Sequence, residues 1–187
     1  MKHQSFFMRS ASAMAVTAAF GAAALAAAPE AGSVIGNQAV ATYTNQAGDT
    51  ITVTSNTVET IVQQVAGVTL TSDNNETIAP GGKAFLPHIV TNEGNGADFF
   101  ALTAVETNTG TLDTSAIVFY PDANMDGVAD SATPLTATPT LAPGEQFGVV
   151  IEVSVPSNAT GSDSITVTAR SDLDGTETAV NTDTLTI

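Results

Sequence analysis

Apolar residues and threonine alternate along much of this chain, and this alternation limits the fold more than any other feature. It is clearest in two segments, Val40-Ala41-Thr42-Tyr43-Thr44 and Thr50-Ile51-Thr52-Val53-Thr54. A period of two places successive side chains on opposite faces of a β-strand, and a branched Cβ suits a pleated sheet. No stretch of ten residues keeps the i, i+3, i+4 spacing of an amphipathic helix. The sequence therefore predicts an all-β protein.

A turn-forming segment separates these two strands. Residues 45–49 read Asn-Gln-Ala-Gly-Asp, which are the residue types that turns favour. The pattern predicts a β-hairpin with a loop of five residues. A hairpin is too small to bury a core of its own. The region 33–64 must therefore pack on the rest of the chain or pair with another molecule.

From residue 66 onward, seven short candidate strands are separated by segments rich in Gly, Pro, Asn and Asp. They are expected near residues 68–71, 84–90, 99–105, 116–120, 147–155, 165–169 and 178–187. Pro87 lies within the second strand and indicates an edge position or a bulge, because proline has no N–H to donate. Seven strands without helices predict an immunoglobulin-like antiparallel β-sandwich with an N-terminal β-hairpin extension. The likeness is to the architecture alone, because the chain has no Cys and no Trp.

The first 26 residues differ from the rest and are typical of a secretory signal peptide. Lys2 and Arg9 provide the positive charge, an alanine-rich apolar run follows, and Ala24-Leu25-Ala26 fits the small-x-small cleavage rule. An uncleaved membrane anchor is the alternative, which the short and weakly apolar run disfavours. We therefore expect an exported protein, extracellular, at the cell surface or in the periplasm, with no transmembrane segment after signal removal. The expected domains are the signal 1–26, the extension 27–65 and the sandwich 66–187.

Charge and cysteine content exclude several functions. The chain has 4 Lys and Arg against 19 Asp and Glu, a formal net charge of −15 and a pI near 4.1. Binding to phosphate groups needs clusters of Lys and Arg, so nucleic acids and anionic membranes are excluded as partners. The absence of Cys excludes disulfides, thiol catalysis and Cys-ligated metals. Beyond residue 26, Lys83 and Arg170 are the only basic residues.

One loop follows the first half of the calcium-binding pattern D-x-N-x-D-G. The residues that would present oxygen atoms to the ion are Asp122, Asn124, Asp126, Val128 (through its carbonyl) and Asp130. The twelfth position is Thr133 instead of a bidentate Glu, and strands flank the loop instead of helices. The pattern therefore predicts a weak Ca²⁺ site, with a Kd of about 10⁻⁴ to 10⁻³ M. The alternative is a solvated acidic loop stabilised by Asx turns.

Known catalytic patterns are missing from the sequence. Neither Gly-x-Ser-x-Gly nor Ser-x-x-Lys occurs, so a hydrolase has no nucleophile in a recognisable setting. Paired carboxylates could in principle hydrolyse glycosides, but a sandwich without Trp offers a poor surface for sugars. His88, the only His beyond residue 26, is expected to be a packed strand residue. We expect no catalytic residues, and no cofactor other than Ca²⁺.

Three stretches resemble a known family. They are Ala31-Gly32-Ser33-Val34-Ile35-Gly36-Asn37-Gln38-Ala39, Val65-Ala66-Gly67-Val68-Thr69-Leu70, and Thr91-Asn92-Glu93-Gly94-Asn95-Gly96. Together they resemble the conserved-repeat immunoglobulin-like domain of exported bacterial surface proteins, in which a Thr-Asn-x-Gly loop follows the second strand. The resemblance implies an extracellular structural module of undefined function. Family members often hold many repeats, whereas this chain holds one.

Two hypotheses about function follow. In the first, the chain is a structural subunit whose extension pairs with a neighbouring sandwich, giving a self-assembling fibre or surface layer. Its partners would be further copies or other surface proteins. In the second, the chain is a monomeric extracellular binding or adhesin domain, with the extension folded back on its own sandwich.

Overall fold

The computed structural model describes residues 28–71, 73–107 and 111–187, so the expected signal peptide 1–26 lies outside the described residues. Every regular element in this part of the chain is a β-strand. The first four strands are β1 (Val34–Asn37), β2 (Val40–Thr44), β3 (Thr50–Thr54) and β4 (Val58–Ile61). The other eight are β5 (Val68–Leu70), β6 (Asn75–Thr77), β7 (Lys83–Asn92), β8 (Phe100–Glu106), β9 (Ala116–Asp122), β10 (Gln146–Ser154), β11 (Ser162–Ser171) and β12 (Thr178–Thr186).

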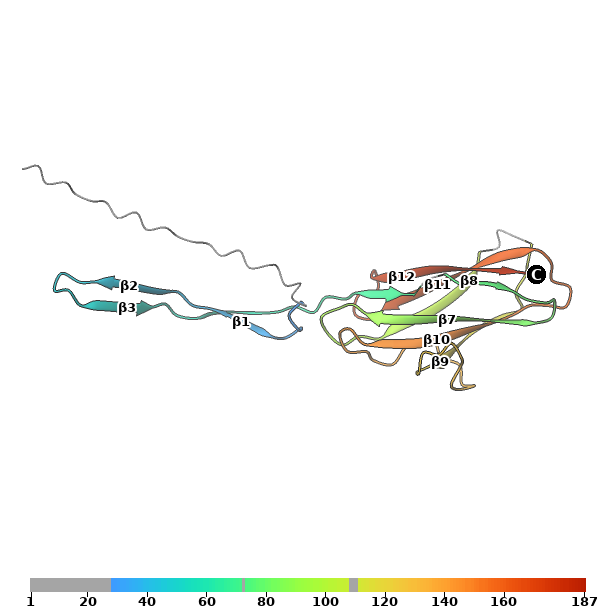
Figure 1. Cartoon of the computed structure of the whole chain (residues 1–187), viewed down its shortest axis with the longest axis horizontal. Helices are drawn as coiled ribbons and strands as arrows, with labels where there is room; N and C mark the ends of the chain where they lie inside the picture. The colour runs from blue at the N-terminus through green and yellow to red at the C-terminus, as the bar shows by residue number, and fades with distance from the viewer. Residues whose placement is uncertain (1–27, 72, 108–110) are drawn as a thin grey trace, which may run out of the picture.

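Strands β5 to β12 form two packed sheets (Figure 1). One sheet has the order β5-β7-β10-β9 and the other β6-β12-β11-β8. Neighbouring strands are antiparallel except β6 and β12, which are parallel. This order, with the first strand divided between the sheets, matches the two-sheet arrangement of immunoglobulin domains. The expected all-β, immunoglobulin-like sandwich is confirmed.

The sandwich has one strand more than the seven that the sequence predicts, because residues near Asn75 were expected to form a turn. Instead β6 runs beside the end of β12, and the N–H of Thr184 donates to the carbonyl of Asn74 at 2.9 Å. All three residues of β6 are exposed and polar. Because the segment contains no apolar residue, it shows no alternation, and its pattern is that of a loop.

Alternating side chains of the long strands fill the space between the two sheets. In β7, Ala84, Leu86, His88 and Val90 are buried, while Phe85, Pro87 and Ile89 between them face outward. The core combines such residues from both sheets. Its fully buried large side chains include Leu86, Phe100, Val149, Ile151, Val153, Ile165 and Leu185. Every member of the core cluster lies at residue 68 or later, so strands β1 to β4 contribute nothing to it.

Pro87 lies in the middle of β7, where the strand is locally an edge. The short β5 pairs with β7 only at residues 90–92. The backbone of Ile89 faces the β5 side, since its carbonyl accepts from the N–H of Thr71 at 3.0 Å. Groups two residues apart in a strand point the same way, so the missing N–H of Pro87 would also point there, beyond the end of β5. The edge position expected from sequence is therefore what the structure shows.

A buried polar cluster holds the chain where it crosses from one sheet to the other. Nε2 of His88 lies 2.8 Å from Oδ2 of Asp183, and both side chains are fully buried. Oδ1 of Asp183 accepts from the N–H of Asn74 at 2.7 Å. The carbonyl of Thr71 lies 3.2 Å from Nδ1 of His88 and also accepts from the Asn181 amide. The expectation that His88 is a packed strand residue agrees with this position.

Strands β8 and β9 are edge strands of the two sheets, and one segment, residues 135–141, lies along both of them. Isolated bridges join Asp98 to Leu141, Ala101 to Ala137 and Phe119 to Leu135. Uncovered strand edges pair with other chains, and natural proteins cover them with loops or charge them. The sandwich therefore protects these edges.

Deleting residues 28–65 should leave the sandwich folded, because the core draws on no side chain from that region. We expect a far-ultraviolet circular dichroism spectrum of β type, and a Tm within about 5 °C of the full chain, a shift of roughly 1 kcal/mol. A matched deletion of residues 38–56 alone should behave in the same way. Loss of a cooperative thermal transition would contradict the prediction and would mean that the extension completes the core.

Candidate interaction site: the N-terminal arm and its socket

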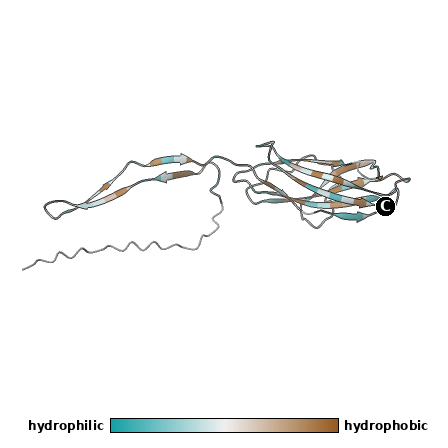
Figure 2. Ribbon diagram, turned by 90° about the horizontal axis from the view of Figure 1, so that it is seen from above, coloured by the Kyte–Doolittle hydropathy of each residue, from teal (hydrophilic) through white to brown (hydrophobic). Residues whose placement is uncertain are grey.

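Residues 28–65, which we call the arm, form a two-stranded ribbon that extends away from the sandwich (Figures 1 and 2). Near the sandwich β1 pairs with β4, with Val34 opposite Ile61. Toward the tip β2 pairs with β3, with Val40 opposite Thr54. Strands β2 and β3 and the loop between them have the bounds expected from the sequence. The arm does not fold back on the sandwich.

A bulge joins the two parts of the ribbon. Asn37 pairs with Val58 on one side and Val40 with Thr54 on the other, so three residues of the second strand oppose two of the first. Ser55 closes this irregularity, because its Oγ accepts from the N–H of Ala39 at 2.9 Å and donates to the carbonyl of Asn56. The extra residue shifts the alternation of the second strand by one position.

The two faces of the tip differ in chemistry. Tyr43 lies opposite Ile51, and Ala41 lies opposite Val53, so one face is apolar. The other face carries threonine pairs such as Thr42 with Thr52. Tyr43 is 53% exposed and Val53 is 51% exposed, so this apolar face lies open to solvent. Exposed apolar area on a two-stranded ribbon marks a surface that is stabilised by a partner.

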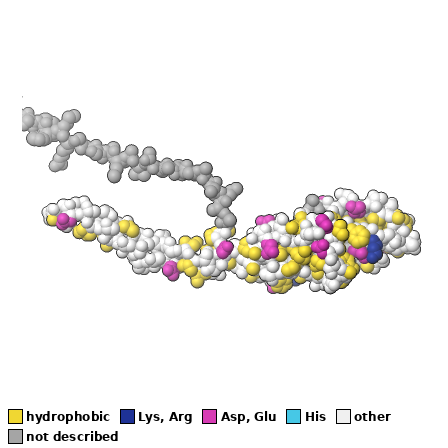
Figure 3. All heavy atoms as spheres, turned by 60° about the horizontal axis from the view of Figure 1, so that its bottom comes forward, with side chains coloured by type: hydrophobic (Ala, Val, Ile, Leu, Met, Phe, Trp, Pro, Cys, Tyr) yellow, Lys and Arg dark blue, Asp and Glu magenta, His cyan; other side chains and the backbone are white. Residues whose placement is uncertain are grey.

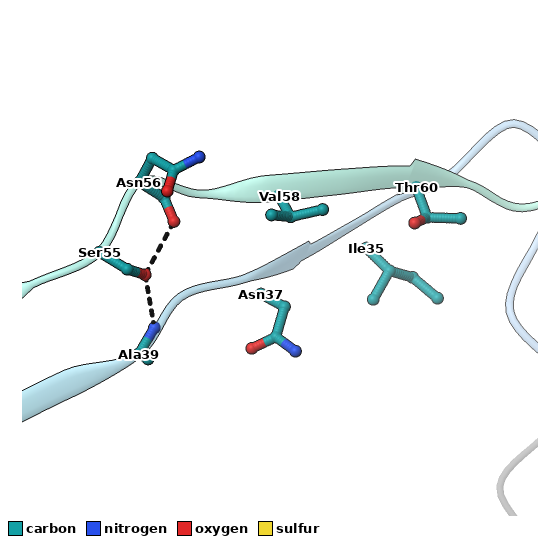
Figure 4. Close-up of a pocket in the computed structure, with 7 residues that line it drawn as sticks. All are labelled: Ile35, Asn37, Ala39, Ser55, Asn56, Val58 and Thr60. Carbon is teal, nitrogen blue, oxygen red and sulfur yellow. Dashed lines mark hydrogen bonds between the residues drawn. The ribbon is translucent and has the colours of Figure 1, made fainter.

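A shallow groove of about 590 Å³ lies on the arm beside the bulge (Figure 4). Ile35 and Val58 supply its larger apolar side chains, and both are more than half exposed. Figure 4 shows Asn37 and Thr60 beside them, on the same side of the ribbon. Alternation along the first strand places residues 35, 37, 39, 41 and 43 on one side. The groove therefore continues toward the apolar face of the tip.

Asn95 fixes the base of the arm to the sandwich. Its Oδ1 accepts from the N–H of Val65 at 2.7 Å, and its Nδ2 donates to the carbonyls of Pro29 and Gln63 at 3.1 and 3.0 Å. Its backbone carbonyl accepts from the N–H of Ala31, and its backbone N–H donates to the carbonyl of Val65. Asn95 thus binds both backbone segments at the base of the arm. We call residues 92–97 the socket.

The residues around Asn95 shape the socket. Asn92 is fully buried and its Nδ2 donates to the carbonyls of Leu141 and Gly96 at 2.8 and 2.9 Å, which fixes the loop to the sandwich. Oδ1 of Asn92 accepts from the N–H of Gly94. A Cβ on Gly94 would lie 2.7 Å from the carbonyl oxygen of Val65, so only glycine allows the arm this close.

The sequence pointed to this loop through the family resemblance but gave it no role. Asn95 contacts residues 30 or more positions away, such as Val65 and Pro29. No local spacing predicts such a contact. The available signal was the density of Asn and Gly in residues 92–96, which indicates a loop whose side chains cap backbone groups.

The five predicted calcium ligands lie at the end of β9 and in the loop that follows it. The side-chain oxygens of four of them accept hydrogen bonds from backbone N–H groups of this segment; they are Asp122, Asn124, Asp126 and Asp130. Asp122 is buried, and its two oxygens accept from the N–H groups of Asp126 and Gly127 at 3.1 and 2.9 Å. Oδ2 of Asp130 accepts from the N–H of Ala123 at 2.7 Å. Two further contacts have the spacing of an Asx turn, from the N–H of Asp126 to Oδ1 of Asn124 and from the N–H of Val128 to Oδ1 of Asp126.

The other three positions, Asn124, Asp126 and Val128, are exposed. Oδ1 of Asn124 accepts from Asp126, and Val128 is 65% exposed. Within the described residues, no group of three or more His, Asp or Glu side chains is arranged to hold a metal ion. Calcium binding by Asp122, Asn124, Asp126, Val128 and Asp130 stays a prediction.

Comparisons with known proteins add no function. No family model and no curated protein matches the chain. A family 123 glycoside hydrolase from Clostridium perfringens is 11% identical with a TM-score of 0.43, covering 65% of this chain and 27% of the enzyme. The PapD-like domain of human CEP192 is 14% identical with a TM-score of 0.34, covering 64% and 84%. Domains 4 and 5 of the S-layer protein SbsC are 16% identical with a TM-score of 0.35, covering 74% and 65%.

These similarities are too distant to indicate an activity or a partner. The chain spans about a quarter of the length of the glycoside hydrolase. No helix among the described residues is both long enough and apolar enough to cross a membrane.

Replacing Asn95 with Ala should loosen the arm without unfolding the sandwich. The variant leaves the Val65 N–H and two carbonyls without their side-chain partner, which costs about 1–3 kcal/mol locally. Hydrogen exchange should become at least tenfold faster at residue 65. The matched control is Asn158→Ala, an exposed Asn at the other end of the sandwich. Unchanged exchange at residue 65 in Asn95→Ala would show that the socket does not hold the arm.

Calcium binding can be tested by calorimetric titration of the full chain, produced in a host that exports it. We expect heat with a Kd of about 10⁻⁴ to 10⁻³ M and a higher Tm at about 10 mM CaCl₂, since an ion that binds only the folded state stabilises it. Asp126→Asn should weaken the binding, whereas Asp172→Asn, which removes the same charge elsewhere, should not. Neither heat nor a thermal shift in the unmodified chain would contradict the site.

Proposed function

We propose that this chain is a secreted or cell-surface structural subunit that associates with further copies of itself by strand pairing through the arm. The observation that carries the proposal is the contrast between the two parts of the molecule. The sandwich has a complete core, whereas the arm exposes an apolar face and two strand edges. The arm is thus the part of the molecule that a partner would complete.

Strand addition to an open edge supplies backbone hydrogen bonds, and pockets for alternate side chains supply selectivity. The paired strands of the arm cover residues 34–44 and 50–61, a ladder roughly 35 Å long at the rise of a β-strand. Each hydrogen bond gained contributes about 0.5–1.5 kcal/mol net. Burial of Tyr43 and Val53 would add to this, and the sum must exceed the roughly 4–15 kcal/mol that association costs.

The charge of the chain supports controlled assembly. At −15, copies repel one another in dilute salt, which keeps free subunits apart. Salt screens this repulsion over about 8–10 Å, and divalent cations would bridge acidic groups directly. We propose that association strengthens with ionic strength and with Ca²⁺. The role is structural, and we propose no catalysis.

A monomeric binding or adhesin domain is the second candidate. The groove beside the bulge favours it, because Asn37, Ser55 and Asn56 offer polar groups next to Ile35 and Val58. A ligand held there would leave the protein monomeric. The number of copies in the complex therefore separates the two functions.

The sample for this test is the full chain, produced in a host that exports it. Its self-association can be measured by light scattering and negative-stain electron microscopy at increasing concentrations of salt and CaCl₂. We expect oligomers or fibres whose mass grows with concentration. Tyr43→Asp, on the apolar face, should lower the extent of association at least tenfold. Thr42→Asp is the matched control, because it adds the same charge to the opposite face of the same strand.

A chain that stays monomeric at high concentration, with and without Ca²⁺, would overturn the proposed function. So would a Tyr43→Asp variant that assembles as the unmodified chain does.

A further inference from the structure

A second apolar surface lies on the sandwich itself. Phe85 and Val128, which are 50% and 65% exposed, line one hollow of about 370 Å³ together with Ala129. An adjoining hollow of about 240 Å³ shares Phe85 and Ala129 and adds Tyr120. We call Phe85, Tyr120, Val128 and Ala129 the far patch. It joins side chains from β7, β9 and the loop after β9 on the outer face of one sheet.

The far patch and the arm lie at opposite ends of the sandwich. The socket begins at Asn92, the last residue of β7, whereas Phe85 lies near the start of that strand. The seven residue-to-residue steps from Phe85 to Asn92 span roughly 23 Å at the rise of a β-strand. The arm points away from the sandwich on the socket side (Figure 1). An arm therefore cannot reach the far patch of its own chain without folding back over the sandwich.

One of the two basic side chains of the described chain lies at the margin of the far patch. Nζ of Lys83 donates to Oε1 of Glu152 at 2.6 Å, and Glu152 lines the same hollow as Phe85. This hydrogen bond raises the pKa of Lys83 above its ordinary value, so the amino group stays charged at neutral pH. On the face shown in Figure 3, basic side chains appear only beside apolar ones, at the end far from the arm.

The charges of the arm are all of the opposite sign. It carries Glu30, Asp49 and Glu59, and no basic residue. The sandwich is acidic as well, including Asp126 and Asp130 in the loop that carries Val128 and Ala129. Lys83, which is paired with Glu152, is the basic group beside the far patch, so attraction of an acidic segment depends on this one side chain. Apolar side chains and a cation thus coincide at one place, and the arm of another copy offers apolar side chains with acidic ones.

The backbone beside the far patch is also open. Strand β5 reaches only residues 90–92 of β7, and no other described strand pairs with that edge between Lys83 and Phe85. The backbone of Ile89 faces the β5 side. Phe85 lies four residues earlier in the same strand, so its N–H and C=O point to that side too, beyond the end of β5. An incoming strand would find both hydrogen-bonding groups and an apolar surface there.

We propose that the far patch, with Lys83 at its margin, receives the arm of a second copy of this chain. The inference rests on the proposed function and names the receiving surface. Arm and far patch are different surfaces at opposite ends, so each contact is head-to-tail and leaves a free arm and a free far patch. Contacts of this kind build an open linear fibre unless the rotation between copies closes a ring.

Complementation between two variants of the full chain tests this arrangement. The first variant, Tyr43→Asp, has an impaired arm and an intact far patch. The second, Val128→Asp, has an intact arm and an impaired far patch. Each alone should lose at least tenfold in association, whereas the equimolar mixture should form one-to-one dimers by analytical ultracentrifugation and no longer species. The arm of the second variant would occupy the far patch of the first.

Controls separate the far patch from general effects of added charge. Val105→Asp and Val180→Asp change side chains that are each 60% exposed and lie outside the far patch, and both should assemble as the unmodified chain does. Phe85→Asp provides a second test of the far patch. A thermal unfolding curve for each variant confirms folding. Lys83→Gln should weaken association by roughly two- to fivefold at low salt, as expected for an exposed charge pair.

The outcomes distinguish this inference from the function on which it rests. Normal assembly by folded Val128→Asp and Phe85→Asp, with Tyr43→Asp impaired, would overturn the far patch and leave arm-mediated association standing. Arms that pair with arms would give that result, as would an arm that docks elsewhere on the sandwich. An unmodified chain that stays monomeric would overturn both.

Discussion

The hydrogen bonds of Asn95 are the interaction on which the shape of this molecule depends. A two-stranded ribbon in water is only marginally stable, and nothing in the arm anchors it except its base. At that base, one amide side chain binds Val65, Pro29 and Gln63 at once. Asn95 is held in turn by a loop that the buried Asn92 ties to Leu141. The sandwich thus determines where the ribbon begins and in which direction it leaves.

Strand edges differ between the arm and the β8 and β9 side of the sandwich. In the sandwich, the segment 135–141 covers the outer edges of β8 and β9. In the arm, neither strand has a neighbour on its outer side among the described residues. Open strand edges can pair with other chains, so a protein that keeps one is at risk of aggregation. In the proposed function, the high negative charge limits premature pairing of these edges, because copies repel one another until salt or cations screen the repulsion.

Local features of the sequence predicted those elements whose pattern depends on one buried face or one turn. Strands β2 and β3 were predicted to the residue, because the alternation and the turn 45–49 lie within one short segment. β6 was missed because its three side chains are all polar, so no alternation marks it as a strand. The socket was missed because Asn95 contacts residues thirty or more positions away, which no local spacing reveals. The acidic loop was recognised as a set, but its oxygens bond to backbone groups of the same loop, which a ligand pattern does not show.

The position of the core determines which residues of the chain can be substituted without loss of stability. All core residues lie beyond the arm, so substitutions on the arm face carry little penalty in folding. Side chains at Tyr43, Val53 and their neighbours are then free to vary with the surface they meet. The socket has no such freedom, because a Cβ at Gly94 would lie 2.7 Å from the Val65 carbonyl oxygen. A constant base with a variable ribbon allows one sandwich to present different contact surfaces without loss of stability.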